Sequence, residues 1–550
     1  MGDEEGVTRG DEAVTIHACL FEAKSIQDYL FQSGRLRDVV GASELIDSLT
    51  EDLLDDVLDS CGLEQGREIE FSRRAGGAFY AFGSDAEVVL RFRDLWTLVV
   101  QQYAPGLAYD IGYGEGSTHL AAFDDARRAL RADGGRYRPR LPVGAPVAER
   151  SRRTGLVAEG MDGDAPADAV TLRRKQFSLP ARAGFVGRFS PPDSGLDWSD
   201  WPRNLEAGAD GAFPFLGDRR TVALIHADGN GLGQLLMNAR AVVEGQPERF
   251  VGVFHAISEG IRQSTQESAR QAVHSVLLPA RSEGGPLPAR PILLGGDDLT
   301  ILVRADLALP FLQVFASAFE MRTADVMNAL AAQGISGLPA HLTVGSGVVY
   351  LRASQPFYLA SLLAESLMVS AKSFAKTMSG NHPPSAVAFH RVTSSLVDEY
   401  EAIVERERSH RDGTEIFVDT LGAYLLDSGD HRVPKLFDLF RLQGLLQQEG
   451  MARGPTRQLL TLLGTAAGQA HHRYRRWRQL MQEHRKHQLQ EFDTVLGQLL
   501  GGAADDSLPF GLADREGRRR SPLGDVLALM AVGNTIPERE PGARTREDAA

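Results

Sequence analysis

Arg290-Pro-Ile-Leu-Leu-Gly-Gly-Asp-Asp-Leu-Thr-Ile-Leu-Val303 is the stretch of this chain that decides its fold. Two short apolar runs flank Gly295, Gly296, Asp297 and Asp298. Apolar runs joined by a glycine-containing turn are typical of a β-hairpin, which would place two adjacent carboxylates at its tip. Carboxylates in that position are suited to hold magnesium against a nucleoside triphosphate. The stretch therefore predicts a nucleotidyltransferase.

A second motif lies upstream of the hairpin. The apolar run Val-Ala-Leu-Ile-His-Ala ends at Asp228, which Gly229, Asn230 and Gly231 follow. A carboxylate at a strand end, next to a glycine-rich turn and a helix start, suits a metal-bound phosphate, because backbone amides there can cradle phosphate oxygens. Asp228 and the two hairpin acids could meet across adjacent strands. We predict these three acids to be the catalytic metal ligands, and the neighbouring glycines and Asn230 to line the nucleotide.

A third element is the predicted helix SLLAESLMVSAKSFAK, which carries Lys372 and Lys376 on one face. A lysine placed there could reach a triphosphate as a point charge. We predict this role for Lys372, whereas for Lys376 a solvated helix surface is an equal alternative.

Composition limits the class of protein. At 550 residues the chain has room for three or four domains, and its net charge of −14 argues against a surface that coats nucleic acid throughout. The two cysteines, Cys19 and Cys61, cannot form a four-cysteine zinc site, and they indicate a reducing compartment. With no signal-like start and no apolar run of membrane-spanning length, the sequence predicts a cytoplasmic protein without membrane contact.

Two parts of the chain repeat the same order of strand, helix, hairpin, helix, strand and helix, which indicates a duplication. The first repeat begins at AVTIHACLFEAK and the second at TVALIHADGNG, so both share a His-Ala pair. On this basis the chain divides as follows: a flexible tail (1–12), a first α+β domain (13–132), an irregular linking module (133–220), a second α+β domain (221–391), an all-helical C-terminal domain (392–532) and a disordered tail (533–550).

Aligning the two repeats predicts that only the second is catalytic. In this alignment Cys19 takes the place of Asp228, and Ala78 and Phe79 take the places of the hairpin acids. With no acid at these positions, the first domain should not bind catalytic magnesium. It could still hold a second nucleotide as the acceptor, or act only as a packing partner.

The strand-end acid, the Gly-Gly-Asp hairpin and the late Ala-Lys helix together resemble the palm fold of GGDEF-type diguanylate cyclases. Two such palms, the second with Gly-Gly-Asp-Asp, followed by a helical domain, resemble the large polymerase-cyclase subunit of CRISPR type III complexes. That resemblance implies an α+β chain with two tandem ferredoxin-like palms. It also implies synthesis of cyclic oligoadenylate from ATP with Mg²⁺ or Mn²⁺, and it places Ser43 and Ser258 near adenine, although both could be ordinary helix residues.

The chain also departs from that family. None of its 14 histidines is followed by aspartate, so an HD nuclease domain is not expected, and the linking module lacks the cysteines of a zinc site. The expected partners are ATP, small CRISPR-type subunits, and guide or target RNA bound through the basic stretch 471–487, in which Tyr474 and Trp477 could stack on bases. Homo-oligomerisation stays open. The alternatives are a non-enzymatic scaffold of an RNA-guided complex and a cyclic dinucleotide synthase.

Overall fold

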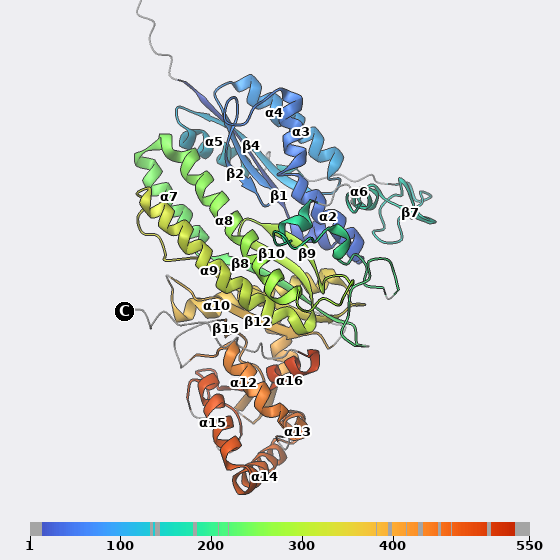
Figure 1. Ribbon diagram of the computed structural model, residues 1–550, viewed down its shortest axis with the longest axis vertical. Coiled ribbons are helices and arrows are strands. Elements are labelled where there is room, and N and C mark those ends of the chain that lie inside the picture. Colours follow the sequence, from blue (N-terminus) through green and yellow to red (C-terminus); the bar gives the residue numbers. More distant parts are fainter. Residues whose placement is uncertain are drawn as a thin grey trace, which may run out of the picture.

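The protein has two palm domains side by side, with a helical region at the end of the molecule farthest from the first palm (Figure 1). The computed structural model describes residues 14–132, 136–137, 144–179, 184–206, 208–217, 219–380, 382–393, 399–413, 415–426, 433–448, 451, 453–463, 465–502 and 508–533. Among these residues, none of the helices combines the length and apolar character that a bilayer crossing requires. The predicted tails, 1–12 and 533–550, lie outside the described residues apart from Gly533.

The first palm is built on a five-stranded sheet with the order β2-β3-β1-β4-β5. Along β1, Ala18 and Leu20 enter the core on one face of the sheet, and Cys19 and Phe21 enter the core on the other. Helix α5 packs with the first face and α4 with the second. The elements are β1 (Ile16–Lys24), α1 (Ile26–Phe31), α2 (Leu36–Ser48), α3 (Asp52–Cys61), β2 (Glu70–Ala75), β3 (Ala78–Gly83), α4 (Ala86–Tyr103), β4 (Ala108–Gly116), α5 (His119–Arg131) and β5 (Arg136–Tyr137).

The second palm has a six-stranded sheet with the order β15-β12-β11-β8-β10-β9. Val222 and Leu224 of β8 pack in the same core as α10, whereas Ala223 and Ile225 face the core that holds α8 and α9. The elements are β8 (Thr221–Asn230), α7 (Leu232–Gly245), α8 (Phe250–Ala272), β9 (Ala289–Gly295), β10 (Asp298–Arg304), α9 (Ala308–Ala332), β11 (Thr343–Arg352), α10 (Phe357–Met378), β12 (Ala386–Arg391) and β15 (Tyr424–Leu425).

The α+β fold with two palms and a helical region is confirmed. The last part, residues 392–532, differs in two ways from an all-helical domain: it contains a small sheet of the order β13-β14-β16, and its strand β15 pairs with β12 at the edge of the second palm's sheet. The linking module holds a short hairpin and α6, which packs against α2. The remaining elements are β6 (Gly160–Asp162), β7 (Ala165–Ala167), α6 (Ala169–Phe177), α11 (Tyr400–Ile403), β13 (Ser409–Asp412), β14 (Glu415–Val418), α12 (Leu436–Gln447), α13 (Arg453–Leu463), α14 (Ala467–His484), α15 (Lys486–Leu500), β16 (Arg518–Arg520) and α16 (Leu523–Val532).

The duplication is visible in the sheets, because β2-β3-β1-β4 of the first palm repeats the order of β9-β10-β8-β11. The hairpin registers show which residues correspond. Ala75 pairs with Ala78 in the first palm, and Gly295 pairs with Asp298 in the second. The two-residue turns therefore superpose Gly77 on Asp297 and Ala78 on Asp298, one position away from the alignment made from the sequence.

The equivalent of Asp228 also differs from the sequence alignment. Ala78 pairs with Glu22 of β1, and the register of β10 with β8, extended by one residue, places Asp298 opposite Asp228. Glu22 therefore holds the strand position of Asp228. The placing of Cys19 at that position is wrong: Cys19 lies three residues earlier and, since side chains alternate along a strand, points into the opposite core.

The two palms meet at their hairpin turns. A Cβ atom added to Gly295 would lie 3.0 Å from the Cα atom of Gly76, so the two glycine turns abut and leave no room for a side chain between them. Gln27 of α1 also reaches across, and its Nε2 lies 2.9 Å from Nε2 of His226 in β8. The first palm therefore packs directly against the hairpin that carries the acids.

The basic helix α14 differs from its prediction. Tyr474 is buried, stacks on Trp477 with ring centroids 5.6 Å apart, and Trp477 packs edge-on against Phe492 of α15. Arg478 pairs with Asp493 at 2.6 Å. These rings pack inside the helical region, so Tyr474 is not available to stack on bases.

Candidate active site

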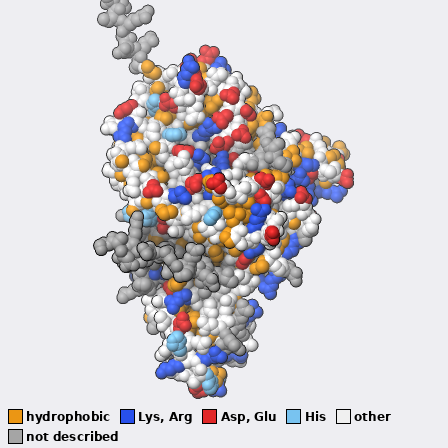
Figure 2. Space-filling model, viewed as in Figure 1, with side chains coloured by type: hydrophobic (Ala, Val, Ile, Leu, Met, Phe, Trp, Pro, Cys, Tyr) orange, Lys and Arg blue, Asp and Glu red, His pale blue; other side chains and the backbone are white. Residues whose placement is uncertain are grey.

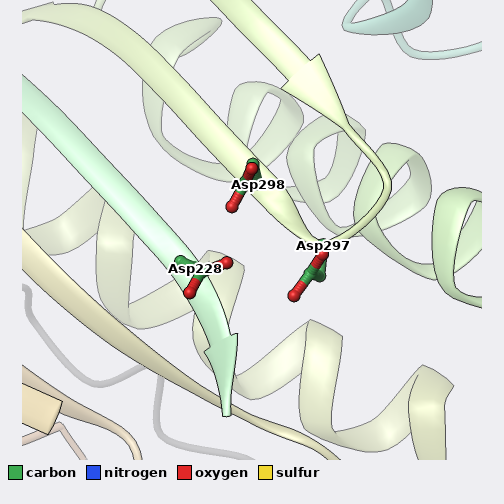
Figure 3. A group of neighbouring side chains, drawn as sticks. All are labelled: Asp228, Asp297 and Asp298. Atoms are coloured by element: carbon green, nitrogen blue, oxygen red, sulfur yellow. The ribbon is translucent and has the colours of Figure 1, made fainter. Parts of the chain in front are cut away.

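Three carboxylates meet where β8 passes the β9–β10 hairpin (Figure 3). Asp228 lies near the end of β8, Asp297 in the hairpin turn and Asp298 at the first position of β10. Each offers an oxygen, and these three oxygens lie within 4.8 Å of one another. Within the part of the chain that the structure describes, this is the one such group of three or more His, Cys, Asp or Glu side chains.

Glycines let the groups approach so closely. A Cβ atom at Gly229 would lie 3.0 Å from the Cβ atom of Asp297, so a larger residue would push the turn away from β8. Gly296 adopts a left-handed φ of 44°, which the tight turn requires. Gly345 of β11 lies opposite Asp228, and a Cβ atom there would collide with the side chain of Lys372. The sequence offered Gly345 only as a glycine inside a strand, so its role was not predicted.

Lys372 of α10 crosses β11 at this gap. Its Nζ contacts the carboxylate of Asp228 and donates to the carbonyl of Gly229 at 3.1 Å. Lys376, one turn later, is exposed. The structure therefore brings Lys372 to the acids and leaves Lys376 at the surface.

The three acids have different protonation tendencies. Burial raises the pKa of Asp298 well above its ordinary range, and the hydrogen bond to Asp228 and the charges of both neighbouring acids raise it further. Burial and the charge of Asp228 raise the pKa of Asp297 to about 7. For Asp228, burial acts to raise the pKa, but the hydrogen bond from Asp298 and the charge of Lys372 outweigh it, so the pKa is lowered.

This arrangement fits a divalent cation. Three carboxylates that repel one another strongly enough to retain protons become stable as anions when a cation lies between them. Their ligand atoms are all oxygens, which are the ligands that Mg²⁺ and Mn²⁺ prefer. Asp228, Asp297 and Asp298 could therefore hold such a metal, with Lys372 as a further positive charge beside it.

Two neighbours that the sequence did not indicate support the site. His226 lies two residues before Asp228 on the same face of β8, and its Nδ1 is 2.9 Å from Oγ1 of Thr300. Burial lowers the pKa of His226 to about 4, and the charge of Lys372 lowers it too, so the ring is neutral. Thr265 of α8 donates to the carbonyl of Gly296 at 2.6 Å and holds the turn from its other side.

The first palm has a different polar group at the corresponding place. Tyr80 donates to Glu22 at 2.6 Å, and Lys24 donates to Glu22 at 2.5 Å. Asp110, which is opposite Glu22 and so corresponds to Gly345, lies 3.5 Å from Lys24. Because Gly77 and Ala78 stand where the hairpin acids stand in the second palm, no hairpin acid lies beside Glu22, and Lys24 neutralises its charge. The described residues of the first palm therefore form no group of three acids, although Glu22 provides an acid at the strand position.

The other predicted residues lie as follows. Ser43 is buried in α2, where its hydroxyl donates to the carbonyl of Val39 at 3.0 Å, and Ser258 is half-buried in α8. Asn230 donates to Oγ1 of Thr343 at 3.0 Å, and Gly231 begins α7 with a left-handed φ of 86°. Asn230 is thus the last residue of β8, and Gly231 joins β8 to α7. The two serines occupy helices beside the hairpins, α2 near Gly77 and α8 at Gly296.

Comparison by sequence gives no relatives: neither a protein-family model nor a curated protein matches the chain. Comparison with solved structures does find matches. The crystal structure of Csm1 in T. onnurineus matches with a TM-score of 0.50 and 13% identity over 94% of this chain and 69% of that chain. A Csm1–Csm4 cassette in complex with cA3 matches with a TM-score of 0.47 and 13% identity over 96% and 71%. A cassette with cA4 matches with a TM-score of 0.36 and 13% identity over 65% and 53%.

At this level of identity the comparison concerns the fold alone. The match to Csm1 extends over both palms and the helical region, since it covers 94% of the chain. The chain therefore has the fold of Csm1, which is the fold that the resemblance to the CRISPR type III polymerase-cyclase family predicts.

Proposed function

We propose that this protein is a metal-dependent nucleotidyltransferase that joins ATP molecules into cyclic oligoadenylate, as a subunit of a CRISPR type III-like defence system. The observation that carries the proposal is the meeting of Asp228, Asp297 and Asp298 with Lys372 at the Gly-Gly-Asp-Asp hairpin. The choice of ATP follows the structural neighbours, which are cassettes in complex with AMPPNP, ATP and a cyclic oligoadenylate.

The reaction forms a bond between the 3′-oxygen of one ATP and the α-phosphorus of another, and pyrophosphate leaves. Bound Mg²⁺ or Mn²⁺ would supply the positive charge that offsets the charge developing on the phosphate oxygens. Asp228, Asp297 and Asp298 would hold that metal. Asp297 lies in the hairpin turn that contacts Gly76 of the first palm, and we assign to it the acceptance of the proton of the 3′-hydroxyl.

Two further features would bind the triphosphate. Lys372 is a cation whose partner, Asp228, would be drawn to the metal, which frees the ammonium group for a phosphate oxygen. Gly229 and Asn230 end β8, and Gly231 leads directly into α7, a helix of 14 residues whose first amides point back to this junction. Free amides at a helix N-terminus favour a bound anion.

The first palm would hold the acceptor ATP. Its polar group at Glu22 and Lys24 lies beside the β2–β3 hairpin, since Glu22 pairs with Ala78, and the turn of this hairpin contacts the second palm at Gly76 and Gly295. A nucleotide on the first palm would thus have its 3′-hydroxyl near the acids of the second. Ser43 in α2 and Ser258 in α8 remain proposed contacts of the two adenine rings.

The partners are part of the same proposal. Several neighbours are complexes of Csm1 with Csm4, and we infer that this chain assembles with a small subunit of that kind and with guide and target RNA. It would act in the cytoplasm.

The test is to incubate the purified chain with each nucleoside triphosphate and Mg²⁺ or Mn²⁺, with and without RNA, and to identify products by mass spectrometry. We expect cyclic oligoadenylate and pyrophosphate from ATP. Asp297→Asn with Asp298→Asn should lower the rate at least about 10³-fold, since these groups hold the metal.

The matched control is Asp325→Asn, an exposed acid of α9 outside the site, which should keep full activity. Oligomer formation by the double variant would show that the site is assigned wrongly. Product from GTP alone would instead indicate a cyclic dinucleotide synthase. An inactive chain that binds partner subunits and RNA would indicate a scaffold.

A further inference from the structure

A track of arginines lies at the end of the second palm that is opposite to the acids. Two adjoining cavities of about 780 and 270 Å³ share Arg219 and Arg352 in their walls. Arg352 pairs with Thr221 at the start of β8, whereas Asp228 lies seven residues further along that strand. At about 3.3 Å per residue, the track is about 23 Å from the acids, so it is a separate site.

The smaller cavity is lined by four arginines from separate segments: Arg219 before β8, Arg352 at the end of β11, Arg391 at the end of β12 and Arg457 in α13. No Asp or Glu is among its lining residues, and no ion pair joins any of these four arginines to a described acid. Burial lowers the pKa of Arg391, and the charges of the other three lower it further. Within the described residues, four like charges therefore come together with no acid paired to them.

The larger cavity continues the positive charge along the linking module and α2. It adds Arg35, Arg37 and Arg220, which also lack an ion pair with a described acid. Its remaining cations, Arg153 and Lys175, pair with Asp162 at 2.6 and 2.7 Å, and Arg153 also pairs with Asp38 at 3.3 Å. Three acids, Asp38, Asp162 and Glu206, line this cavity beside seven cations, so its net charge is positive. Among the described residues, the track thus offers guanidinium groups without an acidic partner along both cavities.

Local backbone geometry also indicates a constrained site. Arg220 has a left-handed φ of 47°, which is uncommon for a residue with a side chain, and its guanidinium lies over the ring of Phe215 at 4.8 Å. Arg219 lines both cavities, and the strained Arg220 beside it lines the larger one. Strain of this kind persists where the surrounding structure fixes it and is often found at functional sites.

The positive charge of the track contrasts with the negative net charge of the chain. The chain as a whole carries a charge of −14, and Figure 2 shows acidic and basic side chains interspersed on the face that it presents. Arginine forks bind phosphate oxygens in pairs, and several in a row match the repeated phosphates of a strand. The lining includes no exposed aromatic ring for a base, so the contacts would be to the backbone and independent of sequence.

We propose that this arginine track binds the sugar-phosphate backbone of a single-stranded nucleic acid. A compact anion such as one triphosphate would fill only the smaller cavity and leave the charges of Arg35, Arg37 and Arg220 unmet. The track differs from the basic helix α14, which the sequence indicated for RNA, and it does not depend on the proposed catalytic activity.

The test is fluorescence anisotropy of the full chain with a labelled 20-nucleotide oligouridine RNA, and with a DNA of equal length. The variant Arg219→Gln/Arg352→Gln/Arg457→Gln changes three exposed arginines of the track. We expect its affinity to fall at least tenfold, and the slope of log K against log salt concentration to become smaller by about 2, because each phosphate contact contributes about 0.7. The matched control Arg67→Gln/Arg131→Gln/Arg515→Gln should bind like the unmodified chain.

Three outcomes would overturn the proposal. One is equal binding by the track variant and the unmodified chain. Another is a loss of affinity in the α14 variant Arg475→Gln/Arg476→Gln and not in the track variant. The third is displacement of the oligonucleotide by inorganic triphosphate at equal concentration, which would show a site for a compact anion. Tighter binding of RNA than of DNA, or the reverse, identifies which strand the track holds. Thermal unfolding of each variant shows whether the fold is kept.

Discussion

Glu22 of the first palm holds the strand position that Asp228 holds in the second palm. Around Asp228 the chain places Asp297 and Asp298, whereas around Glu22 it places Gly77, Ala78 and a neutralising Lys24. One duplicated framework thus carries a group of three acids in one copy and, in the other, Glu22 and Asp110 on either side of Lys24. The difference arises at the hairpin turn and not on the strand.

We predict that Glu22→Gln leaves the transfer step largely intact. Because Lys24 and Tyr80 already occupy the carboxylate of Glu22, its loss removes no metal ligand. The rate at saturating ATP should change less than about threefold, while the ATP concentration for half-maximal rate rises if the acceptor binds there. Pyrophosphate release measures both quantities. A loss as large as that of the Asp297/Asp298 variant would mean that the first palm also holds catalytic metal.

Gly345→Val should block the crossing of Lys372 over β11. Valine suits a strand, so the fold should be kept, but its side chain would occupy the space of the lysine stem. Displacing a positioned group by about 1 Å can cost about 100-fold in rate, and we expect a loss of at least tenfold. The same change made in a Lys372→Ala background should add little, because the lysine is already gone. Full additivity of the two losses would contradict this account.

Divalent metal should stabilise the folded protein through the three acids. A ligand at 100 times its dissociation constant adds about 2.7 kcal/mol, and binding also relieves the repulsion between Asp297 and Asp298. Tm should therefore rise by several degrees when Mg²⁺ or Mn²⁺ replaces EDTA. Asp297→Asn/Asp298→Asn should show little of this rise, with Asp325→Asn as the control. An equal rise in the double variant would place the metal elsewhere.

His390 should make the protein less stable in acid. Burial, together with the charges of Arg408 and Arg391, lowers its pKa from 6.5 to about 3. The unfolded chain therefore binds the proton more tightly than the folded chain, so the contribution of His390 to stability is complete above pH 6.5 and is lost as the pH falls towards 3. His390→Phe removes the titrating group and fills the same space.

The measurement is urea unfolding of the variant and the unmodified chain at pH 7 and pH 5. Relative to the unmodified chain, His390→Phe should have a higher free energy of unfolding at pH 5 than at pH 7. If the difference in free energy of unfolding is the same at both pH values, the ring is protonated to the same extent in the folded and unfolded chains.

The sequence by itself determined the elements of the second palm. Its apolar runs and glycines specified the hairpin, the acids at its tip predicted a metal site, and the helix that carries Lys372 and Lys376 four residues apart predicted a lysine beside these acids. These are local properties of the chain, because strand, turn and helix patterns depend on neighbouring residues. The same local patterns were enough to predict the duplication and, through the family resemblance, the fold that this chain shares with Csm1.

Only the tertiary structure decided the register between strands. The shared His-Ala pairs, His17-Ala18 and His226-Ala227, suggested one alignment of β1 with β8, and the true one differs by three residues. A shift by an odd number of residues moves a side chain to the other face of a sheet. Cys19 therefore lies in the core, and Glu22 holds the position in the first palm that Asp228 holds in the second. Likewise the gap at Gly345, the burial of Tyr474 and the arginine track arise from segments that are distant in sequence. Their positions depend on packing, which no local pattern encodes.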